Sequence, residues 1–173
     1  QPLLTYGATK LVAEKLFVQA NGYAGQRPTR FACVRYGNVI ASQGSVLDLF
    51  AGGLVTGSVP ITDPRMTRFW IDLDAAVRFV RESIAMMHGG EVWIPRIPSA
   101  RVVDMARAVA PEASHEVIGP RSAEKVTESL ISQDEAVQCW ELPDRYVLLP
   151  LYPSWPIVVP EGAVKVADDF RYE

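Results

Sequence analysis

The sequence predicts an α/β fold in which the end of a parallel sheet is followed by a smaller α+β region. Helix-like and strand-like apolar patterns alternate in the first half of the chain, and the segments become shorter toward the C-terminus. Hydrophobic residues make up 49% and charged residues 21% of the 173 residues, which is typical of a folded globular domain. A chain of this length can bury a core of its own.

Four helices and one helical turn are predicted. Apolar spacing indicates a first helix from Leu4 to Ala20, which Asn21-Gly22 should end. Because this helix is apolar on two faces, we expect both faces to be buried. The others are expected over 44–55, over 73–88 between an N-cap at Asp72 and a C-cap at Gly89, over 102–110, and as a turn near 123–128. The core-facing stripe expected in the third helix comprises Leu73, Ala76, Val77, Val80, Ile84 and Met87.

Strands are predicted over 29–36, 59–61, 91–94 and 115–118. From Trp140 onward the chain is rich in proline and should meander with short strands. A complete dinucleotide-binding fold needs a G-x-G-x-x-G turn near its beginning, and these 173 residues do not contain one.

Charge and composition exclude several classes of function. The net charge is −3 without a basic run, which argues against nucleic acid or an anionic membrane as the main partner. The two cysteines, Cys33 and Cys139, fit a reducing compartment, and we expect a cytoplasmic protein because no membrane-length apolar stretch or signal peptide is visible. His88 and His115 are isolated from other ligand residues, so no metal site is predicted.

Tyr6 and Lys10 are the first candidates for chemistry. They are four residues apart on a predicted helix, so their side chains are neighbours. An ammonium group beside a phenol lowers the pKa of the phenol and makes it a usable proton-transfer group. Taken alone, the pair is a weak signal, and a core tyrosine beside a lysine whose head reaches solvent explains it more simply.

The flanking residues resemble a known family. The run Tyr6–Leu16 (YGATKLVAEKL), followed by Val34–Val39 (VRYGNV), is similar to the catalytic region of extended short-chain dehydrogenases/reductases. Within that superfamily, three further motifs resemble the inverting UDP-N-acetylglucosamine 4,6-dehydratases: Arg65–Ile71 (RMTRFWI), Met87–Glu91 (MHGGE) and Arg121–Lys125 (RSAEK).

The resemblance implies a role for each matched residue. Tyr6 and Lys10 would be catalytic and, with Val39, would contact NADP, with NAD as the alternative. The implied substrate contacts are Asn38, Val46, Leu47, Asp48, Leu49, Phe50, Thr62, Arg68, Arg121 and Glu124. A planar guanidinium at Arg121 suits a diphosphate, and a carboxylate at Glu124 can accept from ribose hydroxyls. The implied reaction yields a 4-keto-6-deoxy sugar nucleotide with inversion at C5, for pseudaminic-acid or surface-polysaccharide biosynthesis, in an enzyme expected to be a homo-oligomer.

The resemblance also predicts the domain organisation. Residues 1–58 would be the tail of a Rossmann-like dinucleotide-binding domain and residues 59–173 mainly the sugar-nucleotide-binding region. The glycine-rich half and an Asp-Lys acid/base pair are expected ahead of Gln1, so the 173 residues alone should be inactive. The family's usual Arg-Pro-Gly-Glu-Lys is replaced by a sequence with Ser122 and Ala123, which leaves the exact substrate open. A sugar-nucleotide 4-epimerase of the same superfamily and a non-catalytic UDP-sugar-binding module remain alternatives.

Overall fold

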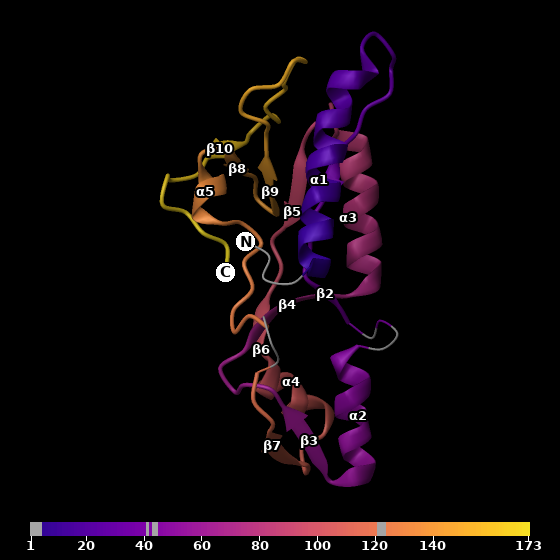
Figure 1. Cartoon of the computed structure of the whole chain (residues 1–173), viewed down its shortest axis with the longest axis vertical. Coiled ribbons are helices and arrows are strands. Elements are labelled where there is room, and N and C mark those ends of the chain that lie inside the picture. Colours follow the sequence, from indigo (N-terminus) through magenta and orange to yellow (C-terminus); the bar gives the residue numbers. More distant parts are fainter. Residues whose placement is uncertain (1–4, 41, 43–44, 121–123) are drawn as a thin grey trace. The chain divides into compact units, whose positions relative to one another are not determined.

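The chain folds into two compact units that alternate along the sequence. The computed structural model describes residues 5–40, 42, 45–120 and 124–173 (Figure 1). The first unit comprises Gln1–Tyr36, Val77–Arg96 and Ser129–Glu173, and the second comprises Gly37–Ala76 and Ile97–Glu128. The division at residue 58 that the sequence suggested stays a prediction.

The first unit is built on a five-stranded sheet. Its strand order is β1 (Cys33–Val34), β5 (Val92–Pro95), β9 (Arg145–Leu148), β8 (Cys139–Glu141) and β10 (Val164–Lys165). β1 and β5 are parallel, whereas the other neighbouring pairs are antiparallel. Its helices are α1 (Thr5–Ala24), most of α3 (Leu73–Met86) and the short α5 (Gln133–Ala136). A parallel pair followed by antiparallel strands matches the predicted change from a parallel sheet to a meandering region.

The core of this unit lies between α3 and the middle of the sheet. Trp93 and Val147 are cross-strand partners with no exposed surface, and Phe79 of α3 packs with them. Burying a side chain of this size contributes about 1.5–3 kcal/mol. These three residues therefore fix which face of α3 meets the sheet.

The end of α1 differs from the prediction. The helix continues past Asn21-Gly22 to Ala24 because the Asn21 side chain does not cap it. Its amide instead donates to the carbonyl oxygens of Val18 (2.8 Å) and Phe31 (2.9 Å), and its oxygen accepts from the Phe31 backbone N–H (3.0 Å). Gly25, with φ of 59°, follows the last turn, where glycine adopts the left-handed conformation at low cost.

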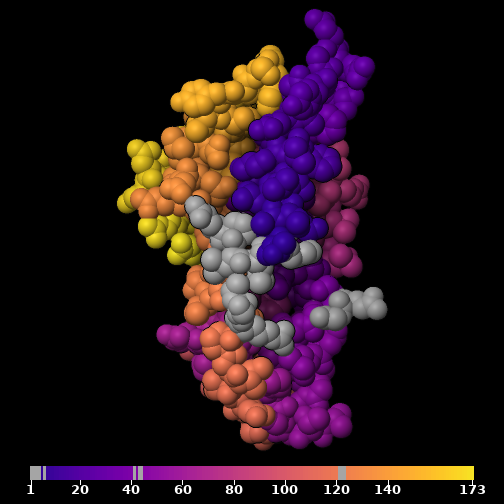
Figure 2. Space-filling model, in the orientation of Figure 1, coloured from indigo at the N-terminus to yellow at the C-terminus, as the bar shows by residue number. Residues whose placement is uncertain are grey.

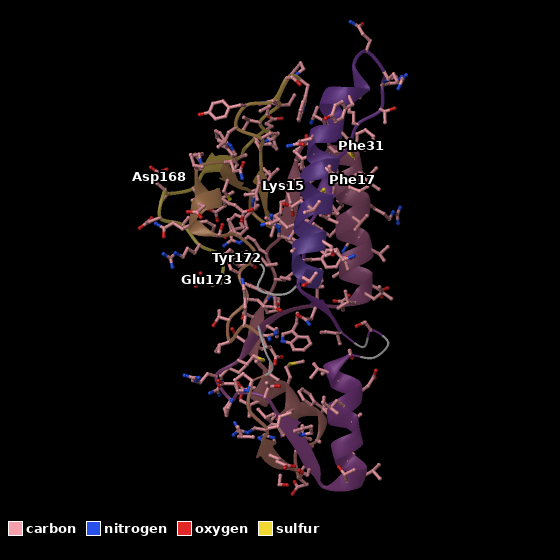
Figure 3. All side chains as sticks on the ribbon, in the orientation of Figure 1. Lys15, Phe17, Phe31, Asp168, Tyr172 and Glu173 are labelled. Carbon is pink, nitrogen blue, oxygen red and sulfur yellow. The ribbon has the colours of Figure 1, made fainter. Side chains whose placement is uncertain are left out.

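The expected burial of α1 on two faces is not seen within the described residues, which cover one face of the helix. Within the first unit, the helix contacts β1 on one side, while Val12, Leu16 and Phe17 are 57%, 60% and 53% exposed. Figure 2 shows α1 in indigo at the surface of this unit. Phe17 still reaches the Phe31 ring, with 6.2 Å between the ring centroids (Figure 3).

The predicted stripe of α3 is confirmed only in part: Ala76 is buried, and Val80 and Met87 are half-buried. Leu73, Val77 and Ile84 are 62%, 50% and 63% exposed. The buried face carries Phe79 and Ser83 instead, because the large ring enters the core and the Ser83 hydroxyl donates to the Phe79 carbonyl at 2.8 Å. A polar residue on the buried face is tolerated when its hydrogen bond is made within the helix.

The described residues of the second unit form two small sheets, the helices α2 and α4, and the first turn of α3. β3 (Ser58–Ile61) and β7 (Ser114–Val117) form a parallel pair, against which α2 (Val46–Thr56) and α4 (Val102–Val109) pack (Figure 1). The second sheet has the order β2 (Asn38–Val39), β4 (Thr67–Ile71) and β6 (Ser99–Arg101). Phe50, Val59 and Ala106 are fully buried between the helices and β3.

Most predicted elements are confirmed in position. α2, α4, β3, β5 and β7 lie where the patterns indicated, and Asp72 caps α3 by accepting from the Ala75 N–H at 2.7 Å. The predicted strand over 29–36 is regular only at β1, although the Arg35 N–H still donates to the Trp93 carbonyl at 2.8 Å.

The predicted helical turn near 123–128 is wrong for its described residues, 124–128. The Val126 carbonyl accepts from the Thr67 N–H of β4 at 2.9 Å, so the segment lies against a strand instead of closing a turn of its own. β4 and α5 were not predicted at all.

Candidate functional site

The predicted catalytic pair lies on α1 in the first unit. Tyr6 and Lys10 are one turn apart on this helix, and Lys10 is exposed. The side chain of Tyr6 lies outside the described residues, so the predicted proton transfer by this pair stays a prediction.

Arg35 ties α1 to the rest of the first unit. Its guanidinium contacts Glu14 of α1 at 2.7 Å and Glu135 of α5 at 2.9 Å, and it donates to the Leu130 carbonyl at 2.7 Å. Burial raises the pKa of Glu135, but hydrogen bonds from Arg35 and Ser132 outweigh burial, so the pKa is lowered. This network holds the helix that carries Tyr6 and Lys10 against the sheet.

Asn38 and Val39 form β2 in the second unit. They are opposite Trp70 and Ile71 of β4, and Asn38 is exposed whereas Val39 is half-buried. Because the Asn38 side chain is exposed, its amide can donate to and accept from a polar ligand. Their predicted contacts with sugar and cofactor remain predictions.

The start of α2 contains five predicted substrate contacts. Val46 and Leu47 are half-buried and pack on the core of the second unit, while Asp48 and Leu49 are exposed. Phe50 has no exposed surface, and its packing explains its presence without a ligand. Side-chain contact with a substrate is therefore easier to reconcile with Asp48 and Leu49 than with Phe50.

Thr62 and its neighbours form the loop between β3 and β4. Thr62 is half-buried, and the next residue, Asp63, accepts from the Arg65 side chain at 2.7 Å and the Arg65 backbone at 2.8 Å. Side-chain hydrogen bonds from Arg65 lower the pKa of Asp63 to about 2. The loop is thus held by an internal charged pair.

Arg68 of β4 contacts the segment 124–128 through its side chain. Its side chain is 11% exposed, and it donates to the carbonyl oxygens of Thr67 (2.7 Å), Lys125 (3.1 Å) and Val126 (3.3 Å). Its Nε lies 3.2 Å from Glu128 Oε1.

Glu124 and Glu128 flank this guanidinium. Glu124 Oε1 lies 3.9 Å from Arg68 Nη2, so the structure brings two predicted substrate residues together. Glu128 was not predicted; its spacing of four residues from Glu124 was the only available signal. Burial raises the pKa of Glu128 against the opposing effects of Arg68 and Lys125. Arg121 lies outside the described residues.

The described part of the chain lacks two kinds of feature. No helix there is both long and apolar enough to cross a bilayer. No group of three or more His, Cys, Asp or Glu side chains is arranged to hold a metal ion.

A family model described as polysaccharide biosynthesis protein matches residues 1–150 of the chain. The chain belongs to the polysaccharide biosynthesis protein family. This membership confirms the resemblance that the motifs around Tyr6 and Arg68 indicated.

Curated relatives of this polysaccharide biosynthesis protein include two enzymes that act on nucleotide sugars. A UDP-N-acetylglucosamine 4,6-dehydratase (inverting) of Campylobacter jejuni is 48% identical over 151 residues, which cover 86% of the chain and 45% of the relative. A UDP-glucose 4-epimerase of Rickettsia conorii is 33% identical over 150 residues, which cover 84% of the chain and 44% of the relative. The chain thus spans about half the length of the curated relatives it matches.

Solved structures confirm the fold of this family member. Pen of Bacillus thuringiensis superposes with a TM-score of 0.87 at 32% identity and covers 99% of the chain and 53% of the other protein. DesIV, a dTDP-glucose 4,6-dehydratase of Streptomyces venezuelae solved with NAD bound, gives a TM-score of 0.64 at 18% identity over 75% of the chain and 43% of its own. The predicted α/β fold class is therefore confirmed.

Proposed function

We propose that the protein containing this chain dehydrates UDP-N-acetylglucosamine to a 4-keto-6-deoxy sugar nucleotide with inversion at C5, for pseudaminic-acid or other surface-polysaccharide biosynthesis. The observation that carries the proposal is the 48% identity over 151 residues to a dehydratase of that name. The family model matches residues 1–150, which contain Tyr6, Lys10 and the Arg68 motif.

Substrate recognition is proposed for the second unit. Glu124 is a carboxylate that can accept from ribose hydroxyls, and the nearby sequence position of Arg121 offers a guanidinium for the diphosphate. Asn38, Asp48, Leu49 and Thr62 would line the remaining parts of the sugar nucleotide. The exposed or half-buried state of these four side chains supports this assignment.

Lys10 of the first unit and Val39 of the second are each of a type that a nicotinamide cofactor can use. Lys10 is an exposed cation one turn from Tyr6, as a ribose-holding residue must be, and Val39 is a half-buried apolar residue that can pack on a planar ring. We propose NADP, with NAD as the alternative. When bound, this group would supply the acceptance of a hydride from sugar C4 and its return to C6.

The chain's own part in the reaction is proton transfer and orientation. Tyr6, as phenolate, would take the proton of the C4 hydroxyl while the Lys10 ammonium stabilises the phenolate. The resulting 4-ketone acidifies the C5 proton, so loss of that proton and of the C6 hydroxyl releases one water. Reprotonation of C5 on the opposite face completes the inversion. The acid and base for the loss of water are expected from residues that precede Tyr6.

The proposal is tested by incubating the full product of the gene with UDP-N-acetylglucosamine and following product mass. A product lighter by one water, formed by the wild type and greatly slowed in Tyr6→Phe, is the expected result. A product of unchanged mass in which only C4 is inverted would favour the 4-epimerase, and binding without any product would favour a non-catalytic module.

A further inference from the structure

We propose that Glu128 is a positioning residue of the nucleotide grip, which is the group of side chains around Arg68 and Glu124. Glu128 holds the Arg68 guanidinium, which fixes the 124–128 segment against β4. This contact thereby orients Glu124. This inference rests on the proposed function for the identity of the ligand. It assigns a role to a residue that the motifs and the resemblance left without one.

The Arg68 guanidinium joins β4 to the 124–128 segment. A guanidinium has five N–H donors in a rigid planar fork. Its Nη1 donates to the Thr67 and Val126 carbonyls, its Nη2 to the Lys125 carbonyl and the Met66 sulfur, and its Nε faces Glu128 at 3.2 Å. All three nitrogens are therefore engaged in joining β4 to the 124–128 segment.

The junction between β4 and the 124–128 segment is largely buried around Arg68. The Arg68 side chain is 11% exposed, and a charge this far from solvent needs a counter-charge. Glu128 supplies it in direct contact, whereas Glu124 is farther away at 3.9 Å. Without the Glu128 charge, Arg68 would attract Glu124 more strongly. Glu124 is the carboxylate proposed to bind ribose.

The contacts of Lys125 and Val126 with β4 also set the position of Glu124. The backbone hydrogen bond from Thr67 to Val126 (2.9 Å) and the two carbonyl contacts of Arg68 fix Lys125 and Val126 along β4. Glu124 directly precedes these two residues, so its carboxylate is set by the same contacts. An error of 1 Å in such a carboxylate is enough to weaken a hydrogen bond to a ligand.

The binding test uses the full product of the gene and calorimetric titration with UDP-N-acetylglucosamine. Glu128→Gln keeps the size of the side chain and should weaken binding about three- to tenfold, since it removes the charged partner of a largely buried guanidinium. Glu116→Gln is the matched control, because Glu116 is an exposed glutamate on β7 of the same unit. It should leave the affinity unchanged.

A double variant separates positioning from a direct contact. If Glu128 acts through Glu124, Glu128→Gln should cost little further affinity when Glu124→Gln is already present. Fully additive losses, or wild-type affinity in Glu128→Gln, would overturn the inference.

Hydrogen exchange provides a readout that does not need a nucleotide. Backbone amides across 124–130 should exchange faster in Glu128→Gln, and also in Arg68→Lys as a second variant, but not in Glu116→Gln. Equal protection in all four proteins would refute the positioning role even if the substrate binds. Failure of the wild type to bind any UDP-sugar would refute the proposed function and leave the exchange result to decide the positioning role.

Discussion

Gly37 is a residue at which the structure leaves no room for a side chain. A Cβ there would lie 2.4 Å from both the carbonyl oxygen and the Cβ of Phe69, on the neighbouring strand. Because backbone atoms cannot move aside as a flexible side chain can, Gly37→Ala should lower the free energy of unfolding by about 1–3 kcal/mol.

Gly52 of α2 is the matched control for this change. A Cβ at Gly52 meets nothing within 4 Å, and alanine in a helix interior is favoured over glycine by about 0.5–1 kcal/mol. Urea denaturation should therefore show opposite signs for the two variants. A neutral Gly37→Ala would mean that β2 does not approach β4 as described.

Among the proposed nucleotide contacts, we expect that of Arg121 to contribute most to the affinity for UDP. Arg121→Ala should weaken UDP binding about ten- to a hundredfold, because a hydrogen bond to a charged group contributes roughly 1.5–3 kcal/mol. Arg121→Lys should recover only part of this, since it keeps the charge but loses the planar fork. Glu124→Gln should cost less, because the amide oxygen still accepts from a hydroxyl.

Calorimetric titration with UDP measures these differences. Wild-type affinity in Arg121→Ala would show that the carried-over role fails at this position. The replacement of the family's Pro-Gly by Ser122-Ala123 makes this a direct test of whether the segment keeps its function.

At the scale of elements, the start of α3 depends on one carboxylate. Asp72 accepts from the Ala75 N–H at 2.7 Å, and replacing such an N-cap by alanine costs about 1 kcal/mol. Ser45 occupies the N-cap position of α2 without making a side-chain cap hydrogen bond. We therefore expect Asp72→Ala to lower the unfolding midpoint clearly and Ser45→Ala to lower it less; the reverse order would contradict the capping geometry.

The junction between α1 and α5 should make stability depend on pH. The pKa of Glu135 in the folded chain is below its ordinary value of 4.5, so its stabilising effect is present above pH 4.5 and is lost as the pH falls through the lowered value. Glu135→Gln removes this titration. Thermal unfolding followed from about pH 6 to about pH 3 should give a shallower acid decline in the variant than in the wild type. Parallel curves would show that Glu135 does not carry this dependence.

The accuracy of the sequence prediction varied with the kind of signal. α2 and β3 were predictable because their apolar patterns agreed with the flanking Gly44 and Gly57, and α4 was predictable from its apolar spacing. β4 was missed because it begins with the polar Thr67 and Arg68, which leaves only three apolar residues, and the partners of these two residues near Val126 are distant in sequence. The end of α1 was misplaced because Asn21 is a stop signal locally, whereas here its amide bonds to the segment near Phe31.

The candidate site was predictable to a similar degree. Tyr6 and Lys10 share a helix, as their spacing predicted. Glu128 could not be recognised, because its role depends on burial beside Arg68, which no local pattern encodes. The buried state of Phe50 was likewise hidden, since an apolar residue near a helix start can face either a ligand or the core.

At the scale of the whole molecule, the proposed reaction is that of relatives about twice as long as this chain. The chain spans about half the length of the relatives it matches, so binding and turnover must be measured on the full product of the gene. The chain's contribution in this account is a proton-transfer pair on α1 and a nucleotide grip around Arg68 and Glu124.

The most direct test of the account is the stereochemical course of the reaction at C5. The full product of the gene should be incubated with UDP-N-acetylglucosamine in deuterated water, and the product examined by NMR. We predict a 4-keto-6-deoxy sugar that has taken up deuterium at C5 with inverted configuration. Recovery of the unchanged sugar, or of its 4-epimer without loss of water or deuterium at C5, would contradict the account.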